Sequence, residues 1–196
     1  LLTKTGGKSG VWVNPDAEIP DWVNDRLPST TPLVDRKIAV IVMSDRASEG
    51  TYDDESGQYL VNALTDQGAE VCAYTVIPDD FALIQTTITE ISETHDPHVI
   101  LCTGGTGPGP RDVTPLAIAE HLNPELPGLG EWLRSESAVY TKTAWLSRMG
   151  GGLIGRALVI TLPGSLQAVK ECFGIFIEGL PKAIMMIEKQ GRKGRL

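Results

Sequence analysis

The sequence predicts an α/β domain in which helices pack on a mostly parallel β-sheet. Short apolar runs rich in β-branched residues alternate along the chain with longer segments whose apolar residues have helical spacing. The apolar runs are continuous, which is typical of strands that are buried on both faces of a sheet. The repeated order of strand and helix indicates parallel strands joined by crossover helices.

Four strands and five helices are expected after residue 36. The strands are KIAVIV (37–42), AEVCAYTVI (69–77), HVILCT (98–103) and ALVITL (157–162). The helices cover 56–67, a segment that starts at Asp79–Asp80, and about 114–121, 128–139 and 166–187. Ser56 is the expected N-cap of the first helix. The expected apolar face of the second helix consists of Leu83, Ile84, Ile88 and Ile91.

The composition excludes several classes of protein. Hydrophobic residues make up 41% of the chain and charged residues 21%, as in ordinary globular domains. Seventeen basic and 25 acidic residues give a net charge of −8, which argues against a nucleic-acid partner. No apolar run reaches the roughly 18 residues of a membrane span, and no signal peptide is visible. The three cysteines form no CxxC pair. We therefore expect a cytoplasmic protein without a membrane partner.

Polar or glycine-rich segments follow each of the four expected strands. They are Ser44–Arg46, Pro78–Asp80, Gly104–Gly107 and Pro163–Ser165. Ligands of open α/β sheets bind beyond the carboxyl ends of the strands. The sequence thus predicts that these four segments meet in one binding site.

The segment TGGTGPGPRD (103–112) predicts a loop that binds phosphate. Its glycines allow backbone N–H groups to approach an anion, and a helix is expected to begin just after the loop. It matches neither the P-loop pattern nor GxGxxG, which excludes the corresponding nucleotide folds. A merely flexible turn remains the alternative. Because the loop ends in Arg111 and Asp112, the phosphate interpretation is favoured.

Asp79 and Asp112 each allow two interpretations. Both precede an expected helix, so each could serve only as a cap. Both also lie at strand ends, where two carboxylates near a phosphate could hold Mg²⁺.

The sequence also contains arginines that could bind phosphate and aromatic residues that could pack or stack. Arg46, Arg111 and Arg148 are the candidate phosphate-binding arginines. We expect Trp132, Tyr140 and Trp145 to pack within the protein rather than to stack on a ligand.

Five segments of the chain, in order, resemble the MoaB/Mog family of molybdopterin adenylyltransferases. They are SDRASEGTYDDESG (44–57), IPDD (77–80), TGGTGPGPRDVTP (103–115), LPGLGE (126–131) with LSR (146–148), and LPGS (162–165). The resemblance extends from about Lys37 to Glu188, and the third segment is its most specific part.

The resemblance implies a fold, an assembly and a reaction. The fold would be a three-layer α/β/α sandwich, and the assembly a homotrimer. The enzyme would transfer AMP from ATP to molybdopterin with Mg²⁺ and release pyrophosphate. The two functional aspartates would be Asp79 and Asp112, both also candidate Mg²⁺ ligands. Substrate and nucleotide contacts would come from Ser44, Asp45, Asp54, Ser56, Gly57, Gly104, Gly105, Thr106, Gly107, Arg111, Glu131, Ser147, Arg148, Pro163, Gly164 and Ser165.

Two functions of different classes stay open from the sequence. One is the adenylyltransferase. The other is a module that binds molybdopterin for cofactor assembly, with other assembly proteins as possible partners, and does not adenylylate it. Some relatives lack the Arg-Asp pair of the third segment, and here Arg111 and Asp112 are both present, which favours the enzyme. A nucleotide-binding regulator is a third option, but no recognition helix or basic face supports it.

The first residues predict a second, truncated domain. LLTKTGGKSGVW (1–12) resembles the C-terminal end of the MoaC family of cyclic pyranopterin monophosphate synthases, and the chain does not begin with Met. We expect a MoaC–MoaB fusion, with 1–12 as the MoaC remnant, 13–36 as a Pro-rich linker, 37–188 as the MoaB/Mog domain and 189–196 as a basic tail. An ordinary N-terminal extension is the alternative.

Overall fold

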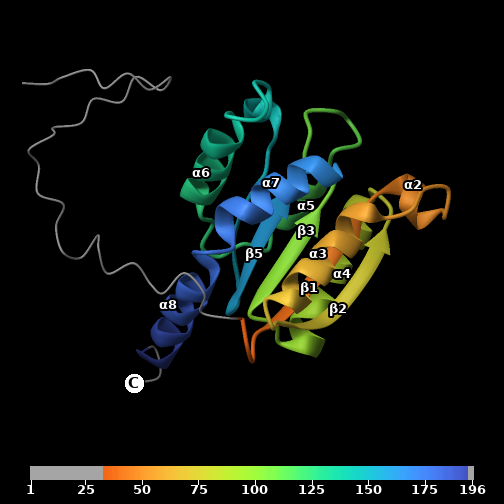
Figure 1. Ribbon diagram of the computed structural model, residues 1–196. Coiled ribbons are helices and arrows are strands. Elements are labelled where there is room, and N and C mark those ends of the chain that lie inside the picture. The colour runs from red at the N-terminus through yellow and green to blue at the C-terminus, as the bar shows by residue number, and fades with distance from the viewer. Residues whose placement is uncertain (1–32, 194–196) are drawn as a thin grey trace, which may run out of the picture. The chain divides into compact units, whose positions relative to one another are not determined.

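The computed structural model describes residues 33–193 (Figure 1). Residues 1–12 and 13–32, which the sequence assigns to a MoaC remnant and to most of a linker, lie outside the described residues. The strands are β1 (Lys37–Met43), β2 (Glu70–Ile77), β3 (Val99–Thr103), β4 (Gly150–Ile154) and β5 (Ala157–Leu162). The helices are α2 (Asp45–Ser48), α3 (Glu55–Asp66), α4 (Phe81–His95), α5 (Thr114–Ala119), α6 (Pro127–Ser137), α7 (Leu166–Phe176) and α8 (Leu180–Lys193), and a 3-10 helix, η1, covers Ala144–Leu146.

The five strands form one mostly parallel sheet in the order β2-β1-β3-β5-β4. Strands β1, β2, β3 and β5 are parallel, and β4 pairs with β5 in the antiparallel direction. The chain passes from β1 to β2 on one side and then returns to β3 on the other side of β1. This reversal makes the space beyond the ends of β1 and β3 the expected ligand crevice.

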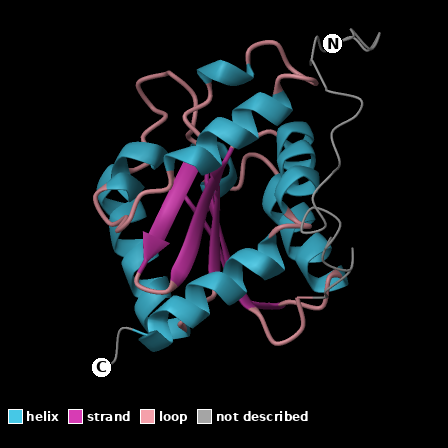
Figure 2. Ribbon diagram, turned by 90° about the vertical axis from the view of Figure 1, so that its left-hand side faces the viewer, coloured by secondary structure: helices cyan, strands magenta, loops and turns pink. Residues whose placement is uncertain are grey.

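Helices cover both faces of the sheet, as the strands buried on both faces require (Figure 2). Ile38, Val40 and Val42 of β1 belong to a core shared with α3, α6, α7 and α8. Ala39 and Ile41 point to the other face and share a second core with α4 and α5. The alternation follows from the two-residue period of a strand, and it produces the three-layer α/β/α sandwich that was predicted.

The predicted strands and most of the predicted helices are present. Three details differ from the prediction. The single helix expected at 166–187 is two helices, because Gly179 and Pro181 lie at the break and proline lacks an N–H for an interior helical bond. Leu83 is 39% exposed and does not belong to the apolar face of α4. Strand β4 begins with three glycines, which are depleted in strands, so its sequence shows no strand pattern.

The sheet domain includes residues on both sides of the segment predicted for it. Leu33 is 1% exposed, and its N–H donates to the carbonyl of Gln67. The guanidinium of Arg36 donates to Glu188 at 2.6 Å. Helix α8 continues through 189–193, part of the segment predicted as a tail. No helix within residues 33–193 has the length and apolar character needed to cross a bilayer.

Candidate active site

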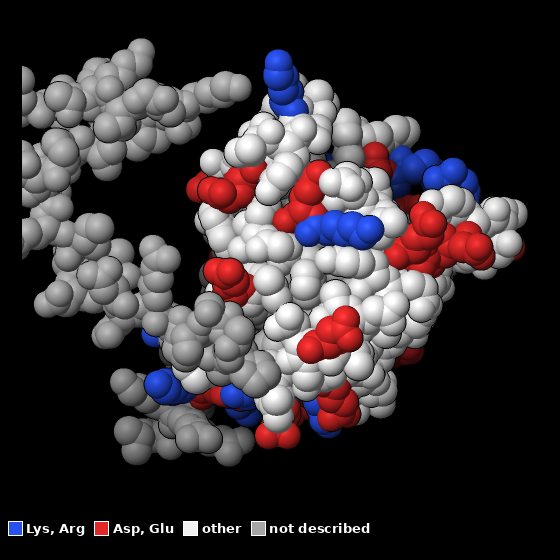
Figure 3. Space-filling view, viewed as in Figure 1, with Lys and Arg blue, Asp and Glu red and all other residues white. Residues whose placement is uncertain are grey.

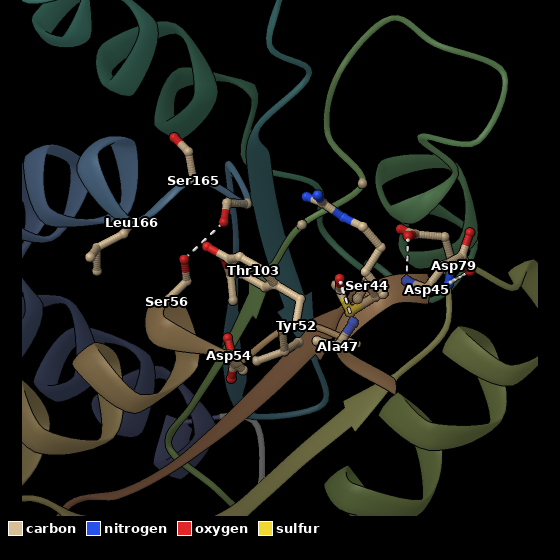
Figure 4. Close-up of a pocket in the computed structure, with 16 residues that line it drawn as sticks. Ser44, Asp45, Ala47, Tyr52, Asp54, Ser56, Asp79, Thr103, Ser165 and Leu166 are labelled. Atoms are coloured by element: carbon tan, nitrogen blue, oxygen red, sulfur yellow. Dashed lines mark hydrogen bonds between the residues drawn. The ribbon is translucent and has the colours of Figure 1, made fainter. Parts of the chain in front are cut away.

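A cavity of about 470 Å³ lies at the carboxyl ends of β1, β3 and β5, beside the reversal in strand order (Figure 4). The loops that follow these strands form its walls, together with the start of α3. Ten residues predicted from the sequence line it: Ser44, Asp45, Arg46, Asp54, Ser56, Asp79, Gly104, Gly105, Gly164 and Ser165. The convergence of strand ends, deduced from the order of elements, therefore agrees with the structure.

Asp45 and Asp79 hold each other through reciprocal hydrogen bonds, shown at the right of Figure 4. The N–H of Asp45 donates to Oδ2 of Asp79 at 3.2 Å, and the N–H of Asp79 donates to Oδ1 of Asp45 at 3.0 Å. Asp80, not Asp79, is the N-cap of α4, and its carboxylate accepts from the N–H of Leu83. The capping interpretation of Asp79 is therefore wrong, and its carboxylate faces the cavity for another reason.

An exposed arginine pairs with this carboxylate cluster. Nη2 of Arg111 lies 2.8 Å from Oδ1 and 2.6 Å from Oδ2 of Asp45. The Arg111 guanidinium, followed by the N–H of Asp79, lowers the pKa of Asp45. In Figure 3, basic and acidic side chains lie next to each other at the upper right, over this end of the sheet. The pairing brings a cation 66 residues away in sequence to the end of β1.

Asp79 has a buried oxygen without a hydrogen-bond partner among residues 33–193. Burial raises the pKa of Asp79, and the charges of Asp45 and Asp112 raise it further, whereas the N–H of Asp45 and the charge of Arg111 oppose the rise. The orphaned oxygen, Oδ1, would lie 2.7 Å from a Cβ on Gly105, and the hydroxyl of Thr114, also without a partner, would collide with the same Cβ. Buried acceptors are nearly always paired, so this oxygen is suited to receive a ligand.

The glycine loop is positioned where side chains cannot fit. Gly104 and Gly105 have φ values of 104° and 59°, a region that glycine adopts readily. A Cβ on Gly104 would collide with the carbonyl oxygen of Met43. A Cβ on Gly164 would lie 3.1 Å from the Cα of Gly104. The loops after β1, β3 and β5 thus pack backbone against backbone at this point.

Asp112 is held inside the loop that precedes it. Its Oδ2 accepts from the N–H of Gly109 at 2.8 Å and would lie 2.7 Å from a Cβ on Gly107. The cap of α5 is Val113, which has no side-chain cap bond, so the prediction of Asp112 as an N-cap is wrong. Asp112 does not line the cavity, although its charge contributes to the raised pKa of Asp79.

Three predicted residues, Glu131, Ser147 and Arg148, line a second cavity of about 380 Å³. The glycine loop connects the two cavities. The hydroxyls of Thr106 and Ser147 lie 3.3 Å apart, and the N–H of Arg148 donates to the carbonyl of Thr106. The Arg148 guanidinium donates to the carbonyls of Gly107 and Asp112. Arg148 therefore supports the loop, and a direct contact between its guanidinium and a phosphate stays a prediction.

The start of α3 forms the other wall of the first cavity. Asp54 is the N-cap and accepts from the N–H of Gly57, so the prediction of Ser56 as the cap is wrong. The Ser56 hydroxyl instead donates to the carbonyl of Gly164 at 2.8 Å (Figure 4). Tyr74 donates to Oδ2 of Asp54 at 2.6 Å, and burial with this bond raises the pKa of Tyr74 to about 12.

Six of the predicted site residues line neither cavity: Gly57, Thr106, Gly107, Arg111, Asp112 and Pro163. Each of them lies in a segment that joins or supports the cavities. Pro163 contributes through its carbonyl, which accepts from the Thr103 hydroxyl at 2.6 Å.

Several site residues have no distinguishing signal in the sequence. Tyr52 lines the first cavity without such a signal, and the predicted Arg46, which also lines it, stacks over the Tyr52 ring at 5.1 Å. Trp132, Tyr140 and Trp145 are 42%, 63% and 71% exposed, so the expectation that they pack within the protein is wrong. Aromatic residues are mostly buried as a class, and only the tertiary structure reveals which are not.

The protein is a mostly parallel α/β domain with a glycine-rich site at the carboxyl edge of its sheet, and comparison with known proteins identifies its family. Residues 39–182 match the family model described as a probable molybdopterin binding domain. The chain belongs to this family, in the MoaB/Mog group.

Relatives that are named for their function support the assignment to this group. A molybdenum cofactor biosynthesis bifunctional protein of Synechococcus elongatus is 40% identical over 188 residues, which are 96% of this chain and 57% of that protein. The chain thus spans little more than half the length of that relative. A molybdopterin adenylyltransferase of Helicobacter pylori is 34% identical over 76% of this chain and 86% of the relative. The crystal structure of MoaB from Thermus thermophilus aligns with a TM-score of 0.73 and 32% identity, over 78% of this chain and 96% of that one.

Proposed function

We propose that this domain is a molybdopterin adenylyltransferase in molybdenum cofactor biosynthesis. It transfers AMP from ATP to the terminal phosphate of molybdopterin and releases pyrophosphate. The observation that carries the proposal is the orphaned, buried oxygen of Asp79 beside the glycine loop, with Arg111 held next to it. Relatives named for this activity at 34–39% identity support it.

The reaction joins two anions, so the site must offset their repulsion. An oxygen of the molybdopterin phosphate attacks the α-phosphorus of ATP, a new P–O bond forms, and the bond to the pyrophosphate oxygen breaks. N–H groups of residues 105–107 would bind phosphate oxygens directly, whereas that of Gly104 already donates to the carbonyl of Leu162. Only Nη2 of Arg111 contacts Asp45, so the rest of the guanidinium is available to the phosphates within the described part of the chain. Preorganised donors of this kind stabilise charge that develops in the transition state.

The donor set also fits a Mg²⁺ ion. Asp79 offers a carboxylate oxygen without a partner, and Mg²⁺ prefers carboxylate and phosphate oxygens. No three His, Cys, Asp or Glu side chains among residues 33–193 come together as a metal site. Substrate phosphates would therefore complete the coordination, which is usual for Mg²⁺. When bound, the ion would neutralise phosphate charge, and Asp79 with Asp112 nearby would hold it in place.

Asp112→Asn is the test of the proposal. The change is nearly isosteric, and the amide oxygen can still accept from the N–H of Gly109, so the loop should keep its shape. Pyrophosphate release from ATP and molybdopterin should fall at least about 100-fold in this variant, while the thermal midpoint stays close to that of the wild type. Full turnover by Asp112→Asn at low Mg²⁺ would contradict the catalytic role assigned to Asp112. Molybdopterin binding by the wild type without any pyrophosphate release would favour a binding module instead.

Exposed aromatic residues support a homotrimer, which we include in the proposal. Trp132 and Tyr140 on and after α6 are exposed, and they border a third cavity beside α7. Leu133 belongs to the core, so it adds nothing to this surface. Light scattering at micromolar protein should give three times the mass of one chain, and a stable monomer would contradict it.

The fusion with an upstream MoaC domain remains a proposal as well. The bifunctional relative matches 96% of this chain with 57% of its own length, so it contains a further region. The full open reading frame tests this: a synthase sequence upstream of Leu1 is expected, and a start codon directly before Leu1 would contradict the fusion.

A further inference from the structure

The second cavity has an exposed tryptophan on its wall. Trp145 lies on η1 and is 71% exposed, yet it lines this cavity together with residues of α5 and α6. Such exposure leaves a large apolar ring in contact with water. Neither the packing of the domain nor the adenylyl transfer at Asp79 gives this ring a role.

The backbone presents Trp145 rigidly. Within the 3-10 turn, the N–H of Leu146 donates to Thr143 and that of Ser147 to Ala144. Ala144 is buried and anchors the turn. Beyond it, Nη1 of Arg134 donates to the carbonyl of Met149 at 2.6 Å, which ties the segment to α6. A ring on so constrained a turn loses little conformational entropy when it binds a ligand.

The same segment runs directly to the glycine loop. Trp145 and Ser147 are two residues apart, so their Cα atoms lie within about 7 Å of each other. The hydroxyl of Ser147 is 3.3 Å from that of Thr106, and the N–H of Arg148 donates to the carbonyl of Thr106 at 2.8 Å. A ligand with phosphate on the loop could therefore extend toward the Trp145 ring.

The other walls of the cavity suit a planar heterocycle. Leu122 and Leu126 provide apolar surface, while Glu131 and Arg134 provide an acceptor and a donor. A fused heteroaromatic ring has two apolar faces and hydrogen-bonding edges, and stacking on an aromatic side chain contributes about 1–3 kcal/mol per base.

We propose that Trp145 stacks on the fused heteroaromatic ring, purine or pterin, of a phosphorylated substrate whose phosphate lies on the loop 104–107. The proposal rests on the proposed function for the identity of the two rings, and it deepens that function by assigning a specificity-determining residue. Trp132 provides a matched comparison. It is also an exposed tryptophan, but it lines the third cavity, whose lining residues make no hydrogen bond to the glycine loop, whereas Ser147 and Arg148 of the second cavity do.

Equilibrium binding by titration calorimetry tests the proposal without turnover. The probes are AMP and 6-hydroxymethylpterin, added separately to the full chain and to its Trp145→Ala, Trp145→Phe and Trp132→Ala variants. Trp145→Ala should weaken one probe about 5- to 100-fold, which identifies the ring, and Trp145→Phe should retain most of the affinity. Trp132→Ala should bind both probes as the wild type does.

Several results would overturn the proposal. They are wild-type affinity of Trp145→Ala for both probes, equal losses in Trp132→Ala, or no binding of either probe by the wild type at millimolar concentration. A change in light-scattering mass caused by Trp145→Ala would also overturn it, because the ring would then pack on another copy of the chain. The calorimetric measurement does not depend on turnover. The role of Trp145 can therefore be judged even if Asp112→Asn does not abolish pyrophosphate release.

Discussion

Charged clusters lie at both ends of β1, and they differ in how completely their atoms are paired. At the amino end, Oε1 of Glu188 lies 2.6 Å from Nη1 of Arg36 and 3.4 Å from Nε2 of His98. Nδ1 of His98 accepts the N–H of Lys37 at 3.0 Å. At the carboxyl end, Asp45 is paired with Arg111, but Oδ1 of Asp79 has no partner in the described residues.

The difference in pairing indicates that the amino-end cluster serves stability and the carboxyl-end cluster serves function. Three buried side-chain atoms lack a partner within residues 33–193, and two of them, on Asp79 and Thr114, flank Gly105. An unpaired buried polar group costs free energy, so the two atoms beside Gly105 are suited to pair with a ligand or an ordered water. The amino-end cluster, in contrast, fastens α8 and the start of β1 to each other.

The largest expected effect is on catalysis at the carboxyl end. Asp79→Asn removes the negative charge that would bind a Mg²⁺ ion. Pyrophosphate release should therefore fall at least about 100-fold. The neighbouring Asp80→Asn is the control, because Asn caps a helix as well as Asp does. Equal losses in both variants would show that the effect is not specific to Asp79.

Gly104→Ala should cause the largest loss of stability. The residue has φ of 104°, and its Cβ would collide with the carbonyl of Met43, so urea denaturation should show a loss of about 2–4 kcal/mol. Gly174→Ala in α7 is the opposite case, because nothing lies within 4 Å of its Cβ. That change should stabilise the protein by about 0.5–1 kcal/mol. A Gly104→Ala protein as stable as the wild type would contradict the close approach of the two loops.

Glu188→Gln should lower stability moderately and leave catalysis unchanged. It weakens the pairing with Arg36 and His98, whose side chains are only partly exposed, and a loss of about 1 kcal/mol is expected after solvent screening. The thermal midpoint should fall by about 2–4 °C. Glu178→Gln is the control, since that residue is exposed. A fall in pyrophosphate release by Glu188→Gln at unchanged stability would contradict the assignment of the amino-end cluster to stability alone.

Tyr74→Phe should have the smallest effect. It removes the hydrogen bond to Oδ2 of Asp54, a residue that lines the first cavity, and should cost about 0.5 kcal/mol of folding free energy because Tyr74 is 37% exposed. Turnover should change less than about twofold, because the N–H of Gly57 still holds the carboxylate. Tyr140→Phe, an exposed residue, should leave chemical denaturation unchanged.

Much of the fold could be predicted because local patterns and chain order carry it. Buried strands such as 37–42 and 98–103 appear as continuous apolar runs, and the crossover order then places their ends together. The first cavity follows from that order and from the glycines at 104 and 105. Strand β4 could not be found in this way, because Gly150–Gly152 become a strand only through pairing with β5.

The sequence by itself determined the α/β layers, the glycine loop and the meeting of strand ends, because hydrophobic periodicity and the lack of a Cβ act locally. Only the tertiary structure decided the partners of each charge and the exposure of each aromatic ring. Asp45 and Arg111 are 66 residues apart, and their pairing depends on how two loops fold over the sheet. Likewise, Trp145 is 71% exposed although the neighbouring Ala144 is buried, and no local pattern encodes which of the two side chains faces solvent.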